Sequence, residues 1–597
     1  MRAIVSGATL PTLYQVLRFW VFFTAAAEDV IPPVQHKGPA GRLLEITVAL
    51  RILAVTSEAF PLAKTGGLGD AVSGLALSVK ESGAQVTLLL PAYPSAMAHV
   101  SHVTEVATLS GLPGGDAVLL GAYCPELGLQ VLLLKNDALY DREGYYVAPD
   151  GAEYPDNGIR YAALAHAAAR VAQGIEGQPR PHIVHAHDWH AALTPLLMHQ
   201  MQITDVKSVL TLHNVAFQGV FPMSLADTLG IAPGYCTGEG LEFWGQLNFL
   251  KAGIRYADLI TVVSHNYARE ILTPKFGCGL EGVLAARGGD LISIPNGIDT
   301  TLWNPQADAY LRGRGFTADH LGNKALCKSE LQRSFGLQED PRATLMAMGS
   351  RLTTQKMADL AAVAIPAALD AHPSLQACII GQGDHGLEAA LRGVAERYPG
   401  RCGVHIGFEE GQAHLLHAGA DILLHGSRFE PFGLTPLYSM RYGTIPVASK
   451  VGGMADTIID PGRDRPAGAM LAATGILFEG EQPRDMALAL DRAMGLRAHP
   501  EIWHAMQVNG MRADFSWAKT APAYLSAYQA LCPNIALDRI PERRRSLAPV
   551  RIGQMPRANP ALAAARPGLA AGNAGKLQRL REGVALDPMA PRRANAA

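Results

Sequence analysis

Short apolar runs alternate with stretches of helical spacing along the chain. Ile52–Val55 is apolar and is followed by the glycine-rich segment Lys64–Asp70. Helical spacing then covers Ala71–Ser82, and Val86–Leu90 is apolar again. Strand, glycine-rich loop, helix and strand in this order are typical of a right-handed parallel βαβ unit. The later apolar runs of this half are Val131–Leu134, Ile183–His185, Val209–Leu212 and Leu259–Val263.

A second series of the same kind begins after Asn296–Asp299. Its apolar runs are Leu345–Met348, Gln376–Ile380, Val404–Ile406, Ile422–His425 and Ile445–Ala448. Helical stretches such as Met357–Ala371 separate these runs. We therefore predict an α/β protein with two Rossmann-like, doubly wound domains. Their strand carboxyl ends are expected to face an interdomain cleft, which is where open α/β sheets bind ligands.

The pattern divides the chain into five segments. They are an N-terminal extension over 1–50, a first domain over 51–295, a second domain over 296–508, closing helices over 509–532 and a basic tail over 533–597. The apolar run Phe19–Ala27 in the extension is shorter than the roughly 20 residues of a membrane-spanning helix. Two interpretations of the extension remain, a signal peptide and a start codon assigned too far upstream.

Charge and cysteine content restrict the class of function. The formal net charge of −2 combines a net charge of −11 over residues 51–532 with +8 in the tail and +1 in the extension. This near-balance argues against a nucleic-acid partner, and no segment predicts a membrane partner. The tail is rich in Ala, Pro and Arg, so we expect it to be largely disordered, either as a basic interaction arm or as an unselected extension. Seven cysteines without a C-x-x-C pair predict reduced thiols and a cytoplasmic protein.

The glycine-rich segment is a candidate anion site. Gly66 and Gly67 allow a ligand to approach the backbone, and Lys64 places a positive charge beside the N–H groups of the following helix start. The spacing matches neither a dinucleotide fingerprint nor a P-loop. A purely structural turn is the alternative interpretation.

Charged residues also follow two apolar runs of the second half. Arg351 and Lys356 suit a diphosphate leaving group, whose growing charge they would stabilise, and the alternative is a solvated surface pair. Glu430 could accept hydrogen bonds from sugar hydroxyls or stabilise positive charge at an anomeric carbon. The alternative for Glu430 is a salt bridge with Arg428.

Histidines gather where two apolar runs of the first half end. The segment His185–His190 ends one run, and His213 follows the next. Several histidines near Asp188 are compatible with a metal site, but no second ligand cluster is evident, so we expect no metal. Asp188 and His213 are instead predicted to line the cleft and bind a polar substrate.

With these motifs in order, residues 51–530 resemble the bacterial glycogen synthases and the related plant starch synthases. The matching motifs are Lys64–Asp70, His185–His190, His213–Gly219, Asn248–Gly253, Asn296–Asp299, Ser350–Lys356, Ser427–Leu434 and Arg441–Pro446. The resemblance implies the GT-B glycosyltransferase fold and retaining transfer of glucose from ADP-glucose to the non-reducing end of glycogen or another α-1,4-glucan. It implies no metal and no other cofactor.

The resemblance also implies roles for individual residues. Lys64 is expected at the ADP-glucose diphosphate, Arg351 and Lys356 at the phosphates as the sugar leaves, and Glu430 near the glucosyl and ribose groups. The residues implied to contact the transferred glucose or the acceptor are Asp188, His213 and Asn296. The complete implied set is catalytic Asp188, His213, Arg351, Lys356 and Glu430, with donor-binding Lys64, Gly66, Gly67, Asn296, Gly433 and Leu434. The absence of an obvious carboxylate nucleophile agrees with front-face substitution, in which preorganised charge lowers most of the barrier.

Several positions depart from the family pattern. Thr354 stands where Trp is usual, Met357 where Gly is usual, and Phe432 where Cys is usual. Pro436 replaces a polar residue, and His265-Asn266 replaces Pro-Thr. These changes surround two loops in which a displacement of about 1 Å could cost about a hundredfold in rate. Two alternatives therefore stay open, a catalytically weak relative that binds glucan or nucleotide, and a GT-B transferase with another sugar-nucleotide donor.

Overall fold

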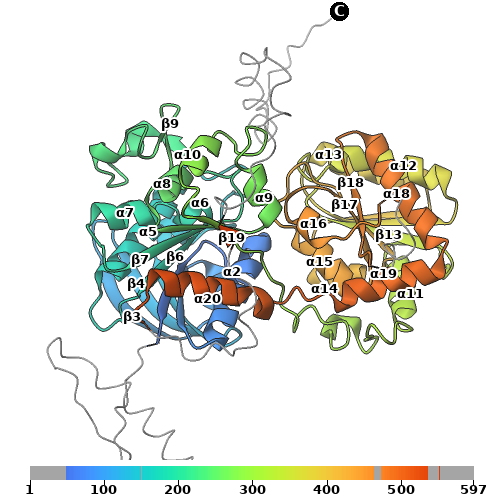
Figure 1. The fold of residues 1–597 in the computed structure, drawn as a ribbon, viewed down its shortest axis with the longest axis horizontal. Helices are drawn as coiled ribbons and strands as arrows, with labels where there is room; N and C mark the ends of the chain where they lie inside the picture. Colours follow the sequence, from blue (N-terminus) through green and yellow to red (C-terminus); the bar gives the residue numbers. More distant parts are fainter. Residues whose placement is uncertain (1–48, 150, 463–471, 536–549, 552–597) are drawn as a thin grey trace, which may run out of the picture.

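Two α/β domains lie side by side in the computed structural model, which describes residues 49–149, 151–462, 472–535 and 550–551 (Figure 1). The first domain, blue to green in Figure 1, contains a ten-stranded sheet, and the second, yellow to orange, a six-stranded sheet. The predicted N-terminal extension, apart from its last two residues, and most of the predicted tail lie outside the described residues. Among the residues that are described, no helix has the length and apolar character needed to cross a bilayer.

The sheet of the first domain has the strand order β19-β12-β11-β7-β6-β1-β2-β5-β4-β3. Its strands are β1 (Arg51–Val55), β2 (Gln85–Pro91), β3 (Ser101–Leu109), β4 (Ala117–Cys124), β5 (Leu129–Lys135), β6 (Ile183–His187), β7 (Lys207–Leu212), β11 (Leu259–Val262), β12 (Leu291–Ser293) and β19 (Val550–Arg551). Strands β12 to β5 run parallel, whereas β3, β4 and β19 are antiparallel. The parallel strands are buried on both faces, which explains their continuous apolar sequences. The mostly exposed β3 lacks such a run and was not predicted.

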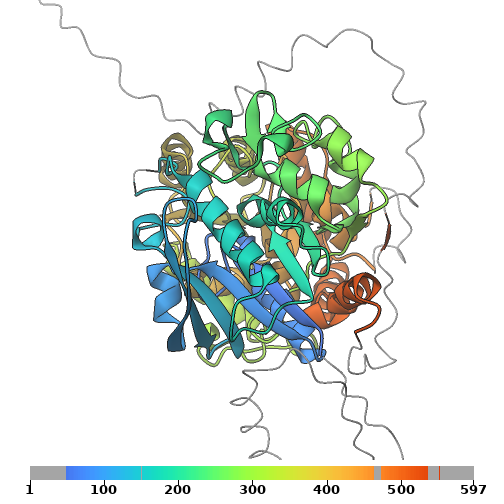
Figure 2. The same cartoon turned by 90° about the vertical axis from the view of Figure 1, so that its left-hand side faces the viewer.

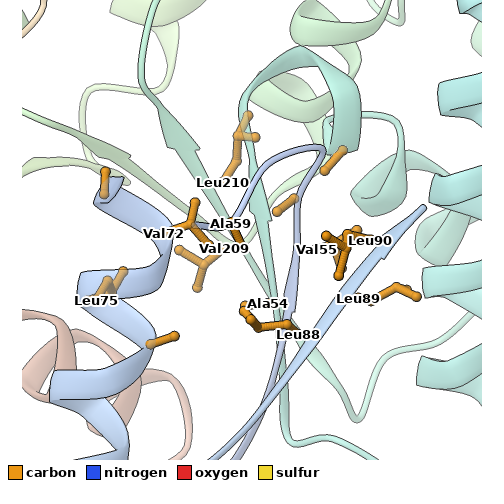
Figure 3. Packing of buried hydrophobic residues seen from close by; sticks show 14 of the residues in the cluster. Ala54, Val55, Ala59, Val72, Leu75, Leu88, Leu89, Leu90, Val209 and Leu210 are labelled. Atoms are coloured by element: carbon orange, nitrogen blue, oxygen red, sulfur yellow. The ribbon is translucent and has the colours of Figure 1, made fainter. Parts of the chain in front are cut away.

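Helices cover both faces of this sheet, as the perpendicular view in Figure 2 shows. They are α2 (Gly67–Glu81), α3 (Pro94–Ala98), α4 (Asp137–Tyr140), α5 (Asn157–Gln173), α6 (Asp188–Ala191), α7 (Thr194–Gln200), α8 (Phe249–Tyr256), α9 (His265–Glu270) and α10 (Glu281–Ala286). A small antiparallel sheet of β8 (Val220–Pro222), β9 (Glu242–Phe243) and β10 (Gln246–Asn248) is added to the domain. Figure 3 shows part of the aliphatic core, in which Val72 and Leu75 of α2 lie near Ala54 and Leu88 of the sheet.

The six strands of the second sheet are all parallel, in the order β15-β14-β13-β16-β17-β18. They are β13 (Thr344–Gly349), β14 (Leu375–Gly381), β15 (Cys402–Ile406), β16 (Ile422–His425), β17 (Ile445–Ser449) and β18 (Ile476–Phe478). The helices are α11 (Lys324–Ser334), α12 (Ala358–Ala371), α13 (His385–Arg397), α14 (Glu410–Gly419), α15 (Leu434–Arg441), α16 (Gly452–Thr457), α18 (Pro483–Arg497) and α19 (Pro500–Arg512).

The last helix of the described residues, α20 (Trp517–Leu531), returns from the second domain to the first and packs on α2 (Figure 1). A Cβ added at Gly74 of α2 would lie 1.9 Å from Trp517 Nε1, so only glycine allows this contact. Tyr528 Oη lies 2.8 Å from His185 Nδ1 in β6. Beyond α20, Val550–Arg551 of the predicted disordered tail forms strand β19, antiparallel to β12. A backbone pairing at a sheet edge needs no apolar periodicity, so the composition of the tail gave no signal for it.

Candidate active site

The starts of α2 and α15 meet where the two domains face each other. A Cβ added at Gly67, the first residue of α2, would lie 3.1 Å from Leu434 Cδ1 at the first residue of α15. Gly433 precedes α15 with φ +87°, where glycine avoids strain. Tyr438 of α15 donates a hydrogen bond of 3.4 Å to Asp70 of α2. Because helix starts present unpaired N–H groups and partial positive charge, this contact favours an anion.

A carboxylate that the sequence did not single out organises the glycine-rich loop. Glu58, which follows β1, accepts hydrogen bonds from Thr65 N at 2.6 Å and Gly66 N at 3.2 Å. Tyr146 Oη donates to the same carboxylate at 2.5 Å. The N–H groups of Thr65 and Gly66 are thus already paired within the protein. A buried Glu soon after a strand, ahead of a Gly-Gly turn, was the available signal for this role.

Lys64, in the loop before α2, pairs with Asp70 in the first turn of that helix. Its Nζ lies 3.0 Å from Asp70 Oδ1, and it also lies over the Phe60 ring at 4.9 Å. Burial raises the pKa of Asp70, although Lys64 opposes this shift. Gly66 has open space where a Cβ would stand, so a ligand can approach the backbone beside Lys64.

Lys356 and Glu430 form a largely buried ion pair at the carboxyl edge of the second sheet. Lys356 lies in the loop after β13 and Glu430 in the loop after β16, and Nζ pairs with Oε2. His425 Nε2 lies 3.6 Å from the same carboxylate oxygen. Burial alone would raise the pKa of Glu430, but Lys356 and His425 outweigh it and hold this pKa well below its usual value. Glu430 therefore remains an anion next to a fixed cation.

The alternative salt bridge between Glu430 and Arg428 is wrong. Arg428 makes a bidentate contact with Asp359, at 2.9 Å and 2.7 Å, and its Nε lies 3.7 Å from Glu481. Its guanidinium is drawn to α12 because two carboxylate oxygens there match its planar donor geometry. The second predicted cation, Arg351, is exposed, with Nη2 3.3 Å from Gln355 Oε1.

Two glycines that the sequence did not single out hold the Glu430 loop. Gly452 has φ +49°, and a Cβ there would lie 1.5 Å from Glu430 O. Gly453 N donates to Pro431 O at 3.1 Å, and a Cβ on Gly453 would lie 2.6 Å from Phe432 Cδ2. No larger residue fits at either glycine without moving the loop. The Gly-Gly pair after β17 was the only sequence signal.

Asp188 and His213 meet at the carboxyl edge of the first sheet. Asp188 is buried with φ +57°, and its Oδ1 accepts hydrogen bonds from His213 N at 2.9 Å and Asn214 N at 3.1 Å. Burial raises the pKa of Asp188 to about 7, against the effect of these two N–H donors. Burial also lowers the pKa of His213 to about 3, so its ring, 3.0 Å from His187 Nδ1, is neutral.

The remaining predicted residue, Asn296, is buried in the segment that leads from the first domain to the second. Its N–H donates to Val263 O at 3.3 Å, while its Oδ1 has no hydrogen-bond partner among the described residues. Buried polar atoms are normally paired, so this oxygen is an unused hydrogen-bond acceptor. Within the described part of the chain, no group of three or more His, Cys, Asp or Glu residues could hold a metal ion.

The structure thus gathers the predicted residues into three groups. They are Lys64, Gly66 and Gly67 with Gly433 and Leu434; Arg351 and Lys356 with Glu430; and Asp188 with His213. Both the second and the third group lie at strand carboxyl ends, where open α/β sheets bind their ligands.

One departure from the family pattern has a visible structural consequence. Met357 has φ +54° and is buried, with Ser449 Oγ 3.6 Å from its Sδ. A left-handed conformation suits the glycine usual at this position and strains a methionine. Thr354 is exposed, and its carbonyl accepts a hydrogen bond from Arg428 Nη1.

Comparison with known proteins decides the family. Residues 51–286 match the starch synthase catalytic domain family, and residues 328–506 match glycosyl transferases group 1. A glycogen synthase of Bordetella parapertussis is 58% identical over 496 residues, which cover 82% of this chain and 97% of that protein. One of Bordetella petrii is 55% identical over 489 residues, covering 82% and 94%. The chain belongs to the glycogen synthase family.

The fold agrees with this family assignment. The catalytic domain of starch synthase IV from Arabidopsis thaliana, bound to ADP and acarbose, superposes with a TM-score of 0.73 at 26% identity. The match covers 82% of this chain and 100% of that domain. The predicted glycogen synthase resemblance, the GT-B fold and the glycosyltransferase class are confirmed. Neither alternative, the weak relative or the transferase with another donor, finds support in these comparisons.

Proposed function

We propose that this glycogen synthase family member transfers glucose from ADP-glucose to the non-reducing 4-hydroxyl of an α-1,4-glucan, with retention at the anomeric carbon. The observation that carries the proposal is the meeting of the α2 and α15 starts at Gly67 and Leu434. Lys64 lies in the loop before α2, and Glu430 of the Lys356–Glu430 pair lies in the loop before α15. Such an arrangement suits a nucleoside diphosphate bound between two domains. The relatives named glycogen synthase, and the similar starch synthase IV bound to ADP, support it.

In this proposal the cations bind the diphosphate. Lys64 and the Gly67 backbone N–H contact it from the first domain, where Gly66 leaves room for the ligand, and Arg351 and Lys356 contact it from the second. As the bond between the anomeric carbon and the phosphate oxygen breaks, charge grows on the leaving diphosphate, and the fixed cations stabilise it. Glu430 holds Lys356 in place through the buried pair and accepts hydrogen bonds from the sugar.

The acceptor attacks from the same face in this proposal. The acceptor 4-hydroxyl oxygen forms the new bond to the anomeric carbon, and its proton goes to the leaving phosphate oxygen. His213 is neutral and serves as a hydrogen-bonding group, since burial lowers its pKa to about 3. The unpaired Asn296 Oδ1 accepts a hydrogen bond from a sugar hydroxyl, and Asp188 fixes the His213 backbone.

Paired lysine variants at the two ends of α2 test this assignment. Lys64 precedes the helix, whereas Lys80 lies in its last turn, about 20 Å away by helix rise. We expect Lys64→Ala to lower kcat/KM for ADP-glucose with glycogen as acceptor by about a hundredfold, because a donor to the leaving group is lost. Lys80→Ala should change it less than about twofold. Equal values for the two variants would remove Lys64 from the proposed site.

A further inference from the structure

Hydrogen bonds link the helix α9 of the first domain to the helix α16 of the second. Figure 1 shows the two helices facing each other at the junction of the domains. α9 follows β11, whose neighbour β7 leads to His213, and α16 follows β17. This junction is separate from the contact of α2 with α15 described above.

In one direction, α9 supplies a carboxylate to α16. Both oxygens of Glu270 lie 3.1 Å from Gly452 N, the first N–H of α16. Asn266 Nδ2 donates to Glu270 Oε1 at 2.7 Å and so orients the carboxylate. Asn266 belongs to the His-Asn pair that departs from the family pattern.

In the other direction, α16 supplies a carboxylate to α9. Asp456 Oδ2 accepts a hydrogen bond of 2.9 Å from Asn266 N in the first turn of α9. First-turn N–H groups have no partner inside their own helix. Opening of the two domains would leave the N–H groups of Asn266 and Gly452 without these protein partners, so the reciprocal bonds exist only in the closed arrangement.

Gly452 is also the residue that touches the proposed active site. Its Cα lies so close to the Glu430 carbonyl that a Cβ would be 1.5 Å from that oxygen. The next N–H, of Gly453, donates to Pro431 O at 3.1 Å. Glu270 of the first domain therefore contacts the Glu430 loop of the second domain through a single residue, Gly452.

We propose that Glu270 is a positioning residue for the transfer reaction, because it fixes Gly452, and through it the Glu430 loop, when the domains close. Charged acceptors make stronger hydrogen bonds to N–H groups than neutral ones do. Closure of the domains and placement of the Lys356–Glu430 pair are then one event. The expected effect on turnover rests on the proposed function. The expected link between α9 and α16 does not.

A cross-domain contact of another kind supplies the matched control. Lys275 pairs with Glu481 at 3.3 Å across the same junction, but both side chains are exposed. Exposed ion pairs contribute little, since water and salt screen them. We expect Lys275→Ala to leave the radius of gyration unchanged and to change kcat less than about twofold.

The first experiment measures turnover with full-length protein, saturating ADP-glucose and glycogen. We expect kcat to fall about tenfold or more in Glu270→Ala, and less in Glu270→Gln, whose amide oxygen still accepts from Gly452 N. In a Glu430→Gln background, Glu270→Ala should lower kcat less than twofold further, because both residues act through one loop. Independent, multiplying effects, or an unchanged kcat in Glu270→Ala, would overturn the positioning role.

The second experiment uses small-angle X-ray scattering and needs no activity. We expect the variant Glu270→Ala with Asp456→Ala to show a larger radius of gyration than the unchanged protein, with Lys275→Ala matching the latter. If the unchanged protein transfers no glucose, the proposed function fails, and the scattering result alone decides the link between α9 and α16. Identical radii for the double variant and the unchanged protein would refute that link. Should Glu270→Ala fold poorly, Glu270→Leu with Asp456→Leu replaces it in both experiments, because neither leucine accepts a hydrogen bond from Gly452 N or Asn266 N.

Discussion

Lys356 and Glu430 form a largely buried ion pair although 73 residues separate them in the chain. Each follows a different strand of the second sheet, and the parallel arrangement of β13 and β16 brings their loops together. Within the site, the pair holds a cation at a fixed position, next to a carboxylate that stays ionised. A preorganised charge of this kind is what a leaving diphosphate requires.

Removal of the cation of this ion pair should strongly lower the free energy of unfolding. Lys356→Ala leaves the buried Glu430 carboxylate without its partner, so we expect a loss of about 3–5 kcal/mol in the free energy of unfolding at neutral pH. The lowered pKa of Glu430 stabilises the fold above the ordinary carboxyl pKa, and this stabilisation is lost as the pH falls below it. Urea denaturation of both proteins from about pH 7 to about pH 3 should therefore show the difference shrinking once the pH falls below about 4.5. A difference independent of pH would contradict the pairing.

The raised pKa of Asp188 should make the stability of the fold depend on pH with the opposite sign. Burial raises its pKa from 3.8 to about 7, so the folded protein binds this proton more tightly than the unfolded chain does. The resulting stabilisation is complete below the unfolded pKa and is lost as the pH rises to about 7, a change on the order of 4 kcal/mol. Asp188→Asn cannot titrate, and Asn tolerates the left-handed backbone observed here. Denaturant titrations should show the unchanged protein losing stability relative to Asp188→Asn between these pH values, and parallel curves would count against the raised pKa.

At position 357, glycine should give a more stable protein than alanine, which is the reverse of the usual order. Both Met357→Gly and Met357→Ala remove a buried side chain and leave a cavity, which costs stability. Only glycine also relieves the strain of φ +54°, which costs about 1–2 kcal/mol in other residues. We expect Met357→Gly to be more stable than Met357→Ala by about 1 kcal/mol in urea denaturation, whereas glycine is usually the less stable of the two. The usual order at this site would show that the backbone is not strained.

Through Tyr528, helix α20 should contribute to the stability of the first domain. Its hydroxyl pairs with His185 at 2.8 Å in the core, and Tyr528→Phe would leave Nδ1 of that histidine buried without a partner. We expect a loss of about 1–3 kcal/mol in the free energy of unfolding. Tyr310→Phe, which alters an exposed tyrosine, should change the same denaturation midpoint very little. If both variants unfold at the same denaturant concentration, the Tyr528 hydroxyl does not anchor α20.

The sequence predicted the parallel strands better than the antiparallel ones. Strands such as β2 and β13 are buried on both faces and stand out as apolar runs within one or two residues of their observed ends. β3 is largely exposed, and the two-residue strand β19 pairs only through its backbone. Hydrophobic periodicity does not report on either of these. It therefore revealed two doubly wound sheets but not their antiparallel edges.

For the site, motif order located the charged side chains but not their partners. Lys64, Lys356 and Glu430 were identified because each follows an apolar run. Tertiary packing decides that Lys356 pairs with Glu430. It also decides that Glu58 accepts hydrogen bonds from the backbone of the glycine-rich loop. Spacing along the chain holds no information on such contacts between loops.

A donor comparison with the purified full-length protein tests glucose transfer from ADP-glucose into an α-1,4-glucan. Labelled ADP-glucose and UDP-glucose are supplied separately with glycogen, and incorporation into the polysaccharide is measured, with Lys64→Ala as the site control. We expect incorporation from ADP-glucose that falls about a hundredfold in Lys64→Ala. No incorporation from either donor, or incorporation that Lys64→Ala leaves unchanged, would contradict it.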